Sequence, residues 1–286
     1  MRKKMKVFLL ICGIVVGIGV IFSVAGLAAG GIQGLARIQE KVPWISFGPE
    51  KMQSQSYECQ PFSSVDLSSG AGDVRFAESD SWRVEVLYAQ RRGAPSVEVK
   101  NQTLIIKPSA EKGKQVYLSF YNGSDEDESI TIYYPQGTKF DQIKADSDMG
   151  DITLGNVAAK SVQIETSAGD VELSEITADT FRLVSDMGDV DGTALNTKAA
   201  DIQTNAGDLE LSGTFSGTTN ISCDMGDCTF STQLSKETYT IEADADAGDC
   251  EVDGLEANGS YRVENPGAKN HLVARTNAGD LELHFQ

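Results

Sequence analysis

A Gly-Asp dipeptide that returns at a fixed spacing constrains this 286-residue chain more than any other feature. The aspartates of the dipeptides are Asp73, Asp151, Asp170, Asp189, Asp208, Asp227, Asp249 and Asp280. The four intervals between Asp151 and Asp227 are equal and define a 19-residue period, whereas the two intervals that follow are longer. Self-similarity at a fixed period is the signature of architectures in which each repeat packs on the next. The chain is therefore expected to fold as a stack of equal units.

Apolar and polar residues alternate on both sides of each dipeptide. The position directly after the aspartate is occupied by Ile152, Val171, Val190, Leu209, Cys228, Cys250 and Leu281. The position six residues before it is occupied by Ile164, Leu183, Ile202, Ile221, Ala243 and Ala274. Alternation with a period of two is typical of a half-buried strand. Each repeat therefore predicts two strands joined by a sharp corner at the glycine.

Stacking is required because no single repeat can bury its own apolar columns. The pattern predicts an all-β fold, with a parallel β-solenoid (β-helix) over residues 146–286 and an N-terminal β cap region over residues 57–145. Residues before the dipeptide alternate between Asp-Met and smaller pairs, so like motifs recur every 38 residues and a 38-residue coil is an alternative. The 19-residue coil is preferred, because the chain has few large apolar residues to fill a wider perimeter.

The N-terminal region predicts a membrane anchor. Residues 7–29 hold no charge, which is enough for a helix that crosses a hydrocarbon core of about 30 Å. The expected order is a basic cytoplasmic tail (1–6), a transmembrane helix (7–30) and a juxtamembrane linker (31–56). The basic tail predicts a single-pass protein of the cell membrane with a cytoplasmic N-terminus and an extracellular C-terminal domain. A cleaved signal peptide is the alternative.

Composition excludes several functions. Asp and Glu outnumber Lys and Arg by 42 to 24, so the net charge of -18 argues against nucleic acid as a partner. His271 and His284 are the only histidines, which excludes a three-histidine zinc site and disfavours a Ser-His-Asp triad.

Four segments together resemble a known family. They are SSGAGDVRF (68–76), SITIYYPQG (129–137), TSAGDVEL (166–173) and TNAGDLEL (204–211). With the N-terminal apolar segment, they resemble a family of bacterial surface proteins known as the putative adhesin family. The resemblance implies a right-handed β-helical domain at the cell surface, and it brings no catalytic residues.

The Asp-x-Gly-Asp sequences suggest a metal site. Stacking would align Asp148, Asp151, Asp186, Asp189, Asp224 and Asp227. Unit charges about 4.8 Å apart repel by roughly 0.9 kcal/mol in water, and a calcium ion between them would relieve this repulsion. The preferred interpretation is nevertheless a purely structural corner, in which the aspartate caps backbone N–H groups and no cofactor is needed.

Cysteines and surface charges complete the predictions. Cys228 and Cys250 occupy one column in successive repeats, so they are expected near disulfide range or as small buried apolar residues. The outward residues Glu172, Glu210, Glu251 and Glu282 predict an acidic face.

The function that best fits is a membrane-anchored, non-enzymatic, adhesin-like binding or scaffold module that contacts an envelope polymer or protein. The alternatives are a carbohydrate-active β-helix enzyme using the loop at 256–269, and an envelope-stress accessory protein.

Overall fold

The computed structural model describes residues 45–46, 51–109, 118–119 and 127–286. The chain divides into two compact units. The first unit, Met1–Glu50 with Lys112–Asp125, contributes to the described residues β1 (Ile45–Ser46) and β8 (Leu118–Ser119), which pair in parallel. The second unit, Lys51–Glu111 with Glu126–Gln286, contains the repeats.

The fold-class prediction is wrong about the membrane helix. Among the described residues, no helix combines the length and the apolar character that crossing a bilayer requires. The predicted span at 7–30 and the tail at 1–6 lie outside the described residues. The fold class is therefore corrected to an all-β solenoid, and no transmembrane helix is found among the described residues. The predicted location as a single-pass membrane protein is corrected with it, since no membrane-spanning helix is found among the described residues.

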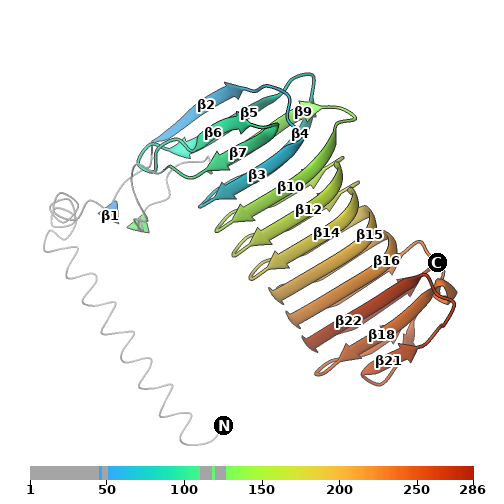
Figure 1. The fold of residues 1–286 in the computed structure, drawn as a ribbon. Coiled ribbons are helices and arrows are strands. Elements are labelled where there is room, and N and C mark those ends of the chain that lie inside the picture. Colours follow the sequence, from blue (N-terminus) through green and yellow to red (C-terminus); the bar gives the residue numbers. More distant parts are fainter. Residues whose placement is uncertain (1–44, 47–50, 110–117, 120–126) are drawn as a thin grey trace, which may run out of the picture. The chain divides into compact units, whose positions relative to one another are not determined.

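Each regular coil of the solenoid consists of a long strand, the Gly-Asp corner, a short strand and a second corner, and is named here after its aspartate (Figure 1). The strands before the Gly-Asp corner form the long-strand wall and include β3 (Ser64–Ser69), β10 (Lys139–Ser147), β12 (Ala158–Thr166) and β14 (Thr177–Ser185). The strands after the corner form the short-strand wall and include β4 (Asp73–Ser79), β11 (Ile152–Gly155), β13 (Val171–Ser174) and β17 (Cys228–Thr232). The Asp73 coil is the exception in length, because β4 is longer than β3. Two strands, β15 (Val190–Ala206) and β16 (Leu209–Met225), continue through the second corner and serve as a short strand and then a long strand.

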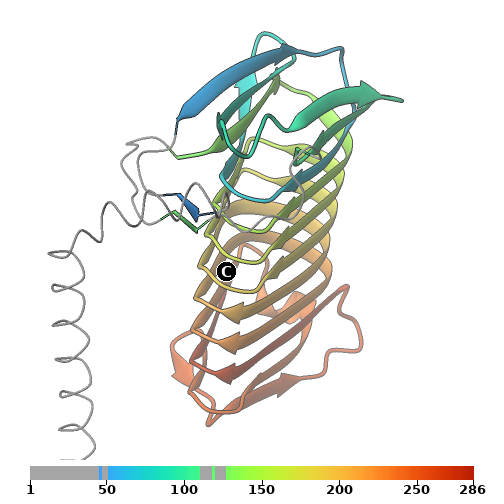
Figure 2. The same ribbon diagram turned by 90° about the vertical axis from the view of Figure 1, so that its left-hand side faces the viewer.

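Equivalent strands of neighbouring coils pair in parallel. Ile152 lies opposite Val171, and Val171 lies opposite Val190. The same column continues through Leu209 to Cys228. Each step has the same offset in residue number, so one turn of the solenoid takes a single 19-residue repeat and the 38-residue coil is excluded. The coils stack one upon another along the solenoid (Figure 2).

The core is made of the columns that the sequence alternation predicts. Ile152, Val171 and Val190 are each 0% exposed, and so are Ile164 and Ile202 on the opposite wall. Burial of apolar surface contributes about 25 cal/mol per Å², and each coil obtains it only from the coils on either side. The predicted β-solenoid is confirmed.

Antiparallel strands cover the N-terminal end of the solenoid. One further parallel level lies on the Asp73 coil, where β7 (Thr103–Lys107) pairs with β3 and β9 (Ser129–Pro135) pairs with β4. Beyond it, the antiparallel strands are β6 (Ser96–Lys100) on β7, β5 (Arg83–Ala89) on β9 and β2 (Met52–Glu58) on β5. The Tyr134 hydroxyl donates to the Gly155 carbonyl at 2.8 Å, and burial raises the pKa of Tyr134 to about 12. These strands keep the parallel edge from pairing with another chain.

The C-terminal coils do not stack in sequence order. In the long-strand wall, β22 (Asn270–Ala278) lies between β16 and β18 (Tyr239–Ala245), as Figure 1 shows. In the short-strand wall, β23 (Leu281–Phe285) lies between β17 and β19 (Cys250–Val252). The last coil is closed by the antiparallel strands β20 (Leu255–Glu256) and β21 (Ser260–Val263), and a short 3-10 turn, η2 (Lys236–Thr238), precedes β18. The Asp280 coil therefore separates the Asp227 coil from the Asp249 coil.

Candidate functional site

The Gly-Asp corners form a continuous hydrogen-bonded ladder. The Asp151 Oδ1 atom accepts the backbone N–H of Asp170 at 2.8 Å, and Asp170 Oδ1 accepts the N–H of Asp189 at 2.9 Å. The same bond, at 2.8–3.0 Å, joins every neighbouring pair from the Asp73 coil to the Asp249 coil. The aspartates thus satisfy backbone donors at each corner, which is the structural role that the sequence left open.

Glycine is required beside each of these aspartates. Gly188 has a φ of +128°, a conformation that side chains with a Cβ rarely adopt. A Cβ at this position would lie 2.2 Å from the carbonyl oxygen of Gly169 in the neighbouring coil. The same close approach recurs between Gly207 and Gly188, at 2.1 Å. The dipeptide repeats because the backbones of successive coils nearly touch at this edge.

The structure brings together only half of the predicted metal ligands. Asp151, Asp189 and Asp227 belong to the ladder, with another ladder aspartate between each pair. Asp186 instead accepts a hydrogen bond from the Asn205 side-chain amide at 2.8 Å, in the next coil.

Asp224 accepts a matching bond from Asn277 at 2.8 Å, and Asp148 lies at the same position of its own coil. Coils with Ser167 or Asn205 at this position alternate with them, so these three carboxylates are two coils apart. Within the part of the chain that the structure describes, no group of three or more His, Cys, Asp or Glu side chains is arranged to hold an ion. Calcium binding stays a prediction.

A column of buried hydroxyl groups precedes the corner, and sequence reasoning missed it. Its members stand four residues before the aspartate and are Ser69, Ser147, Thr166, Ser185, Thr204 and Thr276. The Ser69 hydroxyl donates to the Ala71 carbonyl at 3.0 Å, whereas the Thr166 and Ser185 hydroxyls have no partner among the described residues. The signal was present as a column of Ser and Thr in the aligned repeats.

The order of the coils excludes the disulfide alternative for Cys228 and Cys250, whereas their 0% exposure as free thiols confirms the alternative of small buried apolar residues. Cys228 and Cys250 are not in neighbouring coils, because Leu281 of β23 pairs with both of them. Cys223 takes the place of a hydroxyl residue before the corner, and it lies close to Cys228 after the corner. The hydrogen bond between these two buried thiols lowers the pKa of Cys223 and raises the pKa of Cys228. All four cysteines among the described residues are free thiols.

An acidic column runs along the outer face of the short-strand wall. Glu172 pairs with Asp191, and Asp191 pairs with Glu210, so three exposed carboxylates stand in adjacent coils. After Thr229 the column continues through Glu282, Glu251 and Glu256. Among the described residues, the ion pair recorded for this column is His284 with Glu282 at 3.7 Å. The predicted acidic face is therefore present, and Asp191 and Glu256 extend it.

The long-strand wall carries its charges differently. Lys160 contacts Asp141 at 2.6 Å, and Lys198 contacts Asp179 at 2.7 Å. The hydrogen bond from Lys160 lowers the pKa of Asp141. Lysines on this wall therefore compensate part of its negative charge, whereas Glu172, Asp191 and Glu210 of the acidic column have no ion-pair partner among the described residues.

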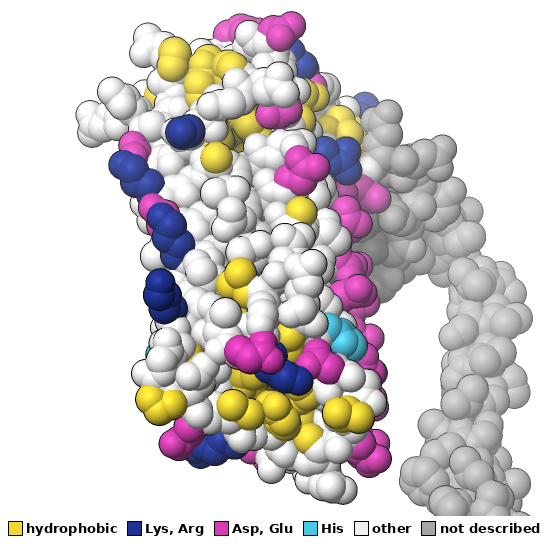
Figure 3. Space-filling view, turned by 90° about the vertical axis from the view of Figure 1, so that its right-hand side faces the viewer, with side chains coloured by type: hydrophobic (Ala, Val, Ile, Leu, Met, Phe, Trp, Pro, Cys, Tyr) yellow, Lys and Arg dark blue, Asp and Glu magenta, His cyan; other side chains and the backbone are white. Residues whose placement is uncertain are grey.

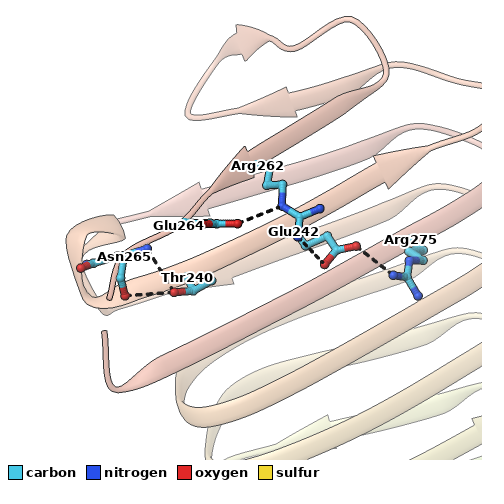
Figure 4. Close-up of polar contacts among 6 residues, drawn as sticks. All are labelled: Thr240, Glu242, Arg262, Glu264, Asn265 and Arg275. Carbon is cyan, nitrogen blue, oxygen red and sulfur yellow. Dashed lines mark hydrogen bonds and ion pairs between the residues drawn. The ribbon is translucent and has the colours of Figure 1, made fainter. Parts of the chain in front are cut away.

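The loop that sequence analysis considered for catalysis closes the last coil. Glu242 of β18 contacts Arg275 of β22 at 3.0 Å and Arg262 of β21 at 3.9 Å, as Figure 4 shows. Arg262 also contacts Glu264 at 3.8 Å. The Asn265 backbone carbonyl accepts a bond from Thr240 at 3.2 Å. These contacts tie β18, β21 and β22 together, which gives the group a structural role at the end of the solenoid.

Stacked coils with glycine–aspartate corners and antiparallel end strands place the protein in the class of β-solenoid repeat proteins. A family model described as Toastrack DUF4097 matches residues 62–285. Since the match covers most of the sequence, the chain belongs to the Toastrack DUF4097 family. The resemblance to a putative adhesin family is thereby confirmed.

Several solved structures are similar to this chain at low sequence identity. A putative adhesin from Bacteroides fragilis is 14% identical with a TM-score of 0.48, and the match covers 83% of this chain and 99% of that chain. A putative cell adhesion protein from Clostridium sporogenes is 13% identical with a TM-score of 0.36, covering 82% and 100%. A putative lipid binding protein from Parabacteroides distasonis is 9% identical with a TM-score of 0.38, covering 83% and 99%. The search of curated proteins gives no match.

Proposed function

We propose that this protein is a non-catalytic, adhesin-like binding module whose acidic column contacts a cationic polymer or protein of the bacterial envelope. The observation that carries the proposal is the stack of Glu172, Asp191 and Glu210 at one outward position. Parallel strands place such side chains about 4.8 Å apart, so the carboxylates repel one another. A partner with regularly spaced positive charges relieves this repulsion along the whole column.

The solenoid architecture supports an extended partner. Each coil repeats the same backbone, so the outer face is long and even, as in repeat proteins that bind elongated ligands. The stacked carboxylates of the short-strand wall allow a cationic partner to distinguish it from the long-strand wall, where lysines contact two of the carboxylates. Electrostatic complementarity of this kind raises the association rate and depends on salt.

Co-sedimentation of the full chain with purified bacterial envelope particles tests this function. The variant Glu172→Gln/Asp191→Asn neutralises two adjacent carboxylates of the acidic column. The matched control Glu165→Gln/Asp146→Asn neutralises two carboxylates at paired positions on the long-strand wall. We expect the column variant to weaken retention about 5-fold or more at low salt, since each exposed charge contact is worth up to about 1 kcal/mol.

The control variant should bind like the unmodified chain. Equal loss in both variants, or retention that does not fall as salt rises, would contradict binding through the acidic column. Absence of retention for the unmodified chain would contradict the proposed function itself. Thermal unfolding of both variants verifies that they remain folded.

A further inference from the structure

A groove with a mixed polar and apolar lining follows the second corner of several coils. One hollow of about 530 Å³ and a neighbouring one of about 380 Å³ share Ala194, Gly213 and Gln233 in their walls. The groove extends from Glu175 in the Asp170 coil to His284 in the Asp280 coil. It crosses five coils, or four strand spacings, which corresponds to about 19 Å.

The groove exists because one coil is shorter at this corner. In β15, Thr193 and Ala194 lie between the paired positions Gly192 and Leu195, whereas β16 has only Ser212 in the equivalent place. The backbone of β16 therefore approaches β15 closely, and a Cβ at Gly213 would lie 2.0 Å from the Leu195 carbonyl oxygen. The surface recedes at this point and opens the hollow beside Ala194.

Hydrogen-bonding side chains without charge line most of the groove. They are Thr177, Asn196, Ser212, Thr214, Ser231, Thr232, Gln233 and Gln286. The Thr214 hydroxyl donates to the Gln233 Oε1 atom at 3.3 Å, which leaves the Gln233 Nε2 donors available. The Ser231 hydroxyl has no hydrogen-bond partner among the described residues, whereas the Ser212 hydroxyl donates to the Gly192 carbonyl at 3.3 Å. The lining thus offers both donors and acceptors to a ligand.

The groove also offers an aromatic surface and little charge. The Phe285 ring is half-buried and packs edge-on against Tyr239, with ring centroids 5.5 Å apart. Glu175 and His284 are the ionisable side chains in the lining, although the chain carries a net charge of -18. Figure 3 shows one side of the solenoid, on which uncharged surface fills the middle and a hydrophobic patch lies below a short band of charged side chains.

We propose that this groove binds a neutral oligosaccharide. Sugar hydroxyls donate and accept hydrogen bonds alternately, which suits the amide and hydroxyl lining, and the apolar face of a sugar ring stacks on an aromatic side chain. The coil spacing of about 4.8 Å is similar to the length of one sugar ring, so successive rings meet successive coils. This site goes beyond the acidic column, because its chemistry selects an uncharged ligand.

Isothermal titration of the full chain with chitotetraose and with cellotetraose tests the proposal. We expect saturable binding of at least one neutral tetramer with a Kd below about 1 mM, equivalent to about -4 kcal/mol. The groove variant Ser231→Ala/Gln233→Ala should weaken this binding about 5-fold or more, because it removes two hydrogen-bonding side chains. The variant Phe285→Leu keeps an apolar side chain but removes the ring, and it should also weaken binding.

A matched control is available on the long-strand wall, away from the groove. Gln203 and Ser222 are exposed and occupy paired positions in β15 and β16, so Gln203→Ala/Ser222→Ala makes the same chemical change outside the groove. This control should bind with unchanged affinity. The proposal is overturned if no neutral tetramer binds up to about 5 mM, if the groove and control variants lose affinity equally, or if tetragalacturonate binds more tightly than both neutral tetramers. Envelope co-sedimentation reports on the acidic column separately, so each proposal can fail without the other.

Discussion

The two corners of each coil differ in how much variation they accept. At the Gly-Asp corner, all coils from Asp73 to Asp249 repeat the same dipeptide and the same inter-coil hydrogen bond. At the second corner, one equivalent position has a positive φ near 55° in three successive coils, and it is occupied by three different residue types, Asn156, Glu175 and Ala194. The β16 strand then loses one residue at this corner and the groove opens.

The difference follows from what lies next to each backbone. At the Gly-Asp corner the neighbouring main chains approach so closely that no Cβ fits, and only one residue type is compatible. At the second corner of the Asp151, Asp170 and Asp189 coils the side chain faces solvent, so left-handed backbone costs about 1–2 kcal/mol and is tolerated in different residues. In β16 this corner is tighter, and a Cβ at Gly213 would meet the neighbouring main chain. We infer that the first corner holds the stack together and that the second is free to acquire binding chemistry.

Adding a methyl group at the Gly-Asp corner and removing one at the second corner tests this comparison with the largest expected effect. Gly188→Ala places a Cβ 2.2 Å from the Gly169 carbonyl oxygen, at a φ of +128°. We expect a loss of at least about 3 kcal/mol of unfolding free energy, or roughly 6–12 °C in Tm, by calorimetry.

The reciprocal change at the second corner is Ala194→Gly, which relieves a φ of 54°. It should leave stability unchanged or raise it by up to about 1 kcal/mol. A similar loss of stability in both variants would show that the two corners are equally constrained.

The two sides of the Gly-Asp corner can be compared through the cysteines. Cys228→Ser buries a hydroxyl in an apolar column where the site is 0% exposed, and we expect a loss of about 2 kcal/mol in chemical denaturation. Cys223→Ser introduces the residue type that Ser147 and Ser185 already have at the equivalent position, so its cost should stay below about 1 kcal/mol. An equal loss of unfolding free energy in both variants would mean that the position of Cys223 stabilises a buried hydroxyl no better than the apolar column does.

The ladder itself can be tested at its middle and at its end. Asp189→Ala removes the acceptor of the Asp208 N–H bond at 2.8 Å, and we expect a loss of about 1 kcal/mol. Asp249 is in the last coil, and its carboxylate accepts no such bond from another coil among the described residues. Asp249→Ala should therefore cost less than about 0.5 kcal/mol, because it removes no hydrogen bond between coils. A larger cost for the end position than for the middle one would contradict the ladder as a source of stability.

Most of the repeated part of the fold could be predicted because it depends on short-range rules. The 19-residue offset, the inward columns and the glycine corners all follow from alternation and from the conformational needs of glycine. The order of the last coils does not follow from these rules, since Leu281 and Cys250 fit the same column beside Cys228 equally well. Only the closing strands β20 and β21 decide it, because the coil that they cover has to be the outermost one.

The candidate sites were less predictable for a related reason. The acidic face could be predicted because each outward carboxylate is visible in the aligned repeats. The groove depends on a one-residue difference between β15 and β16, which the constant spacing of the Gly-Asp dipeptides conceals. The missing residue at Ser212 is compensated at Ser216 and Gly217, where β16 has one residue more than β15. The two changes cancel in the sequence spacing, and only the register of the strands reveals them.

Calcium removal has the smallest expected effect on the Gly-Asp corner. The Oδ1 atoms of the ladder already accept backbone N–H groups, and Asp186 and Asp224 accept side-chain amides. We therefore expect Tm to change by less than about 1 °C between excess EDTA and 1 mM calcium. An ion bound to the folded state with a Kd of about 0.1 mM would add about 1.4 kcal/mol at that concentration, and so raise Tm by roughly 3–6 °C. A rise of that size, lost in Asp186→Asn but kept in Glu165→Gln, would establish a calcium site at the corner and give the ladder a second role.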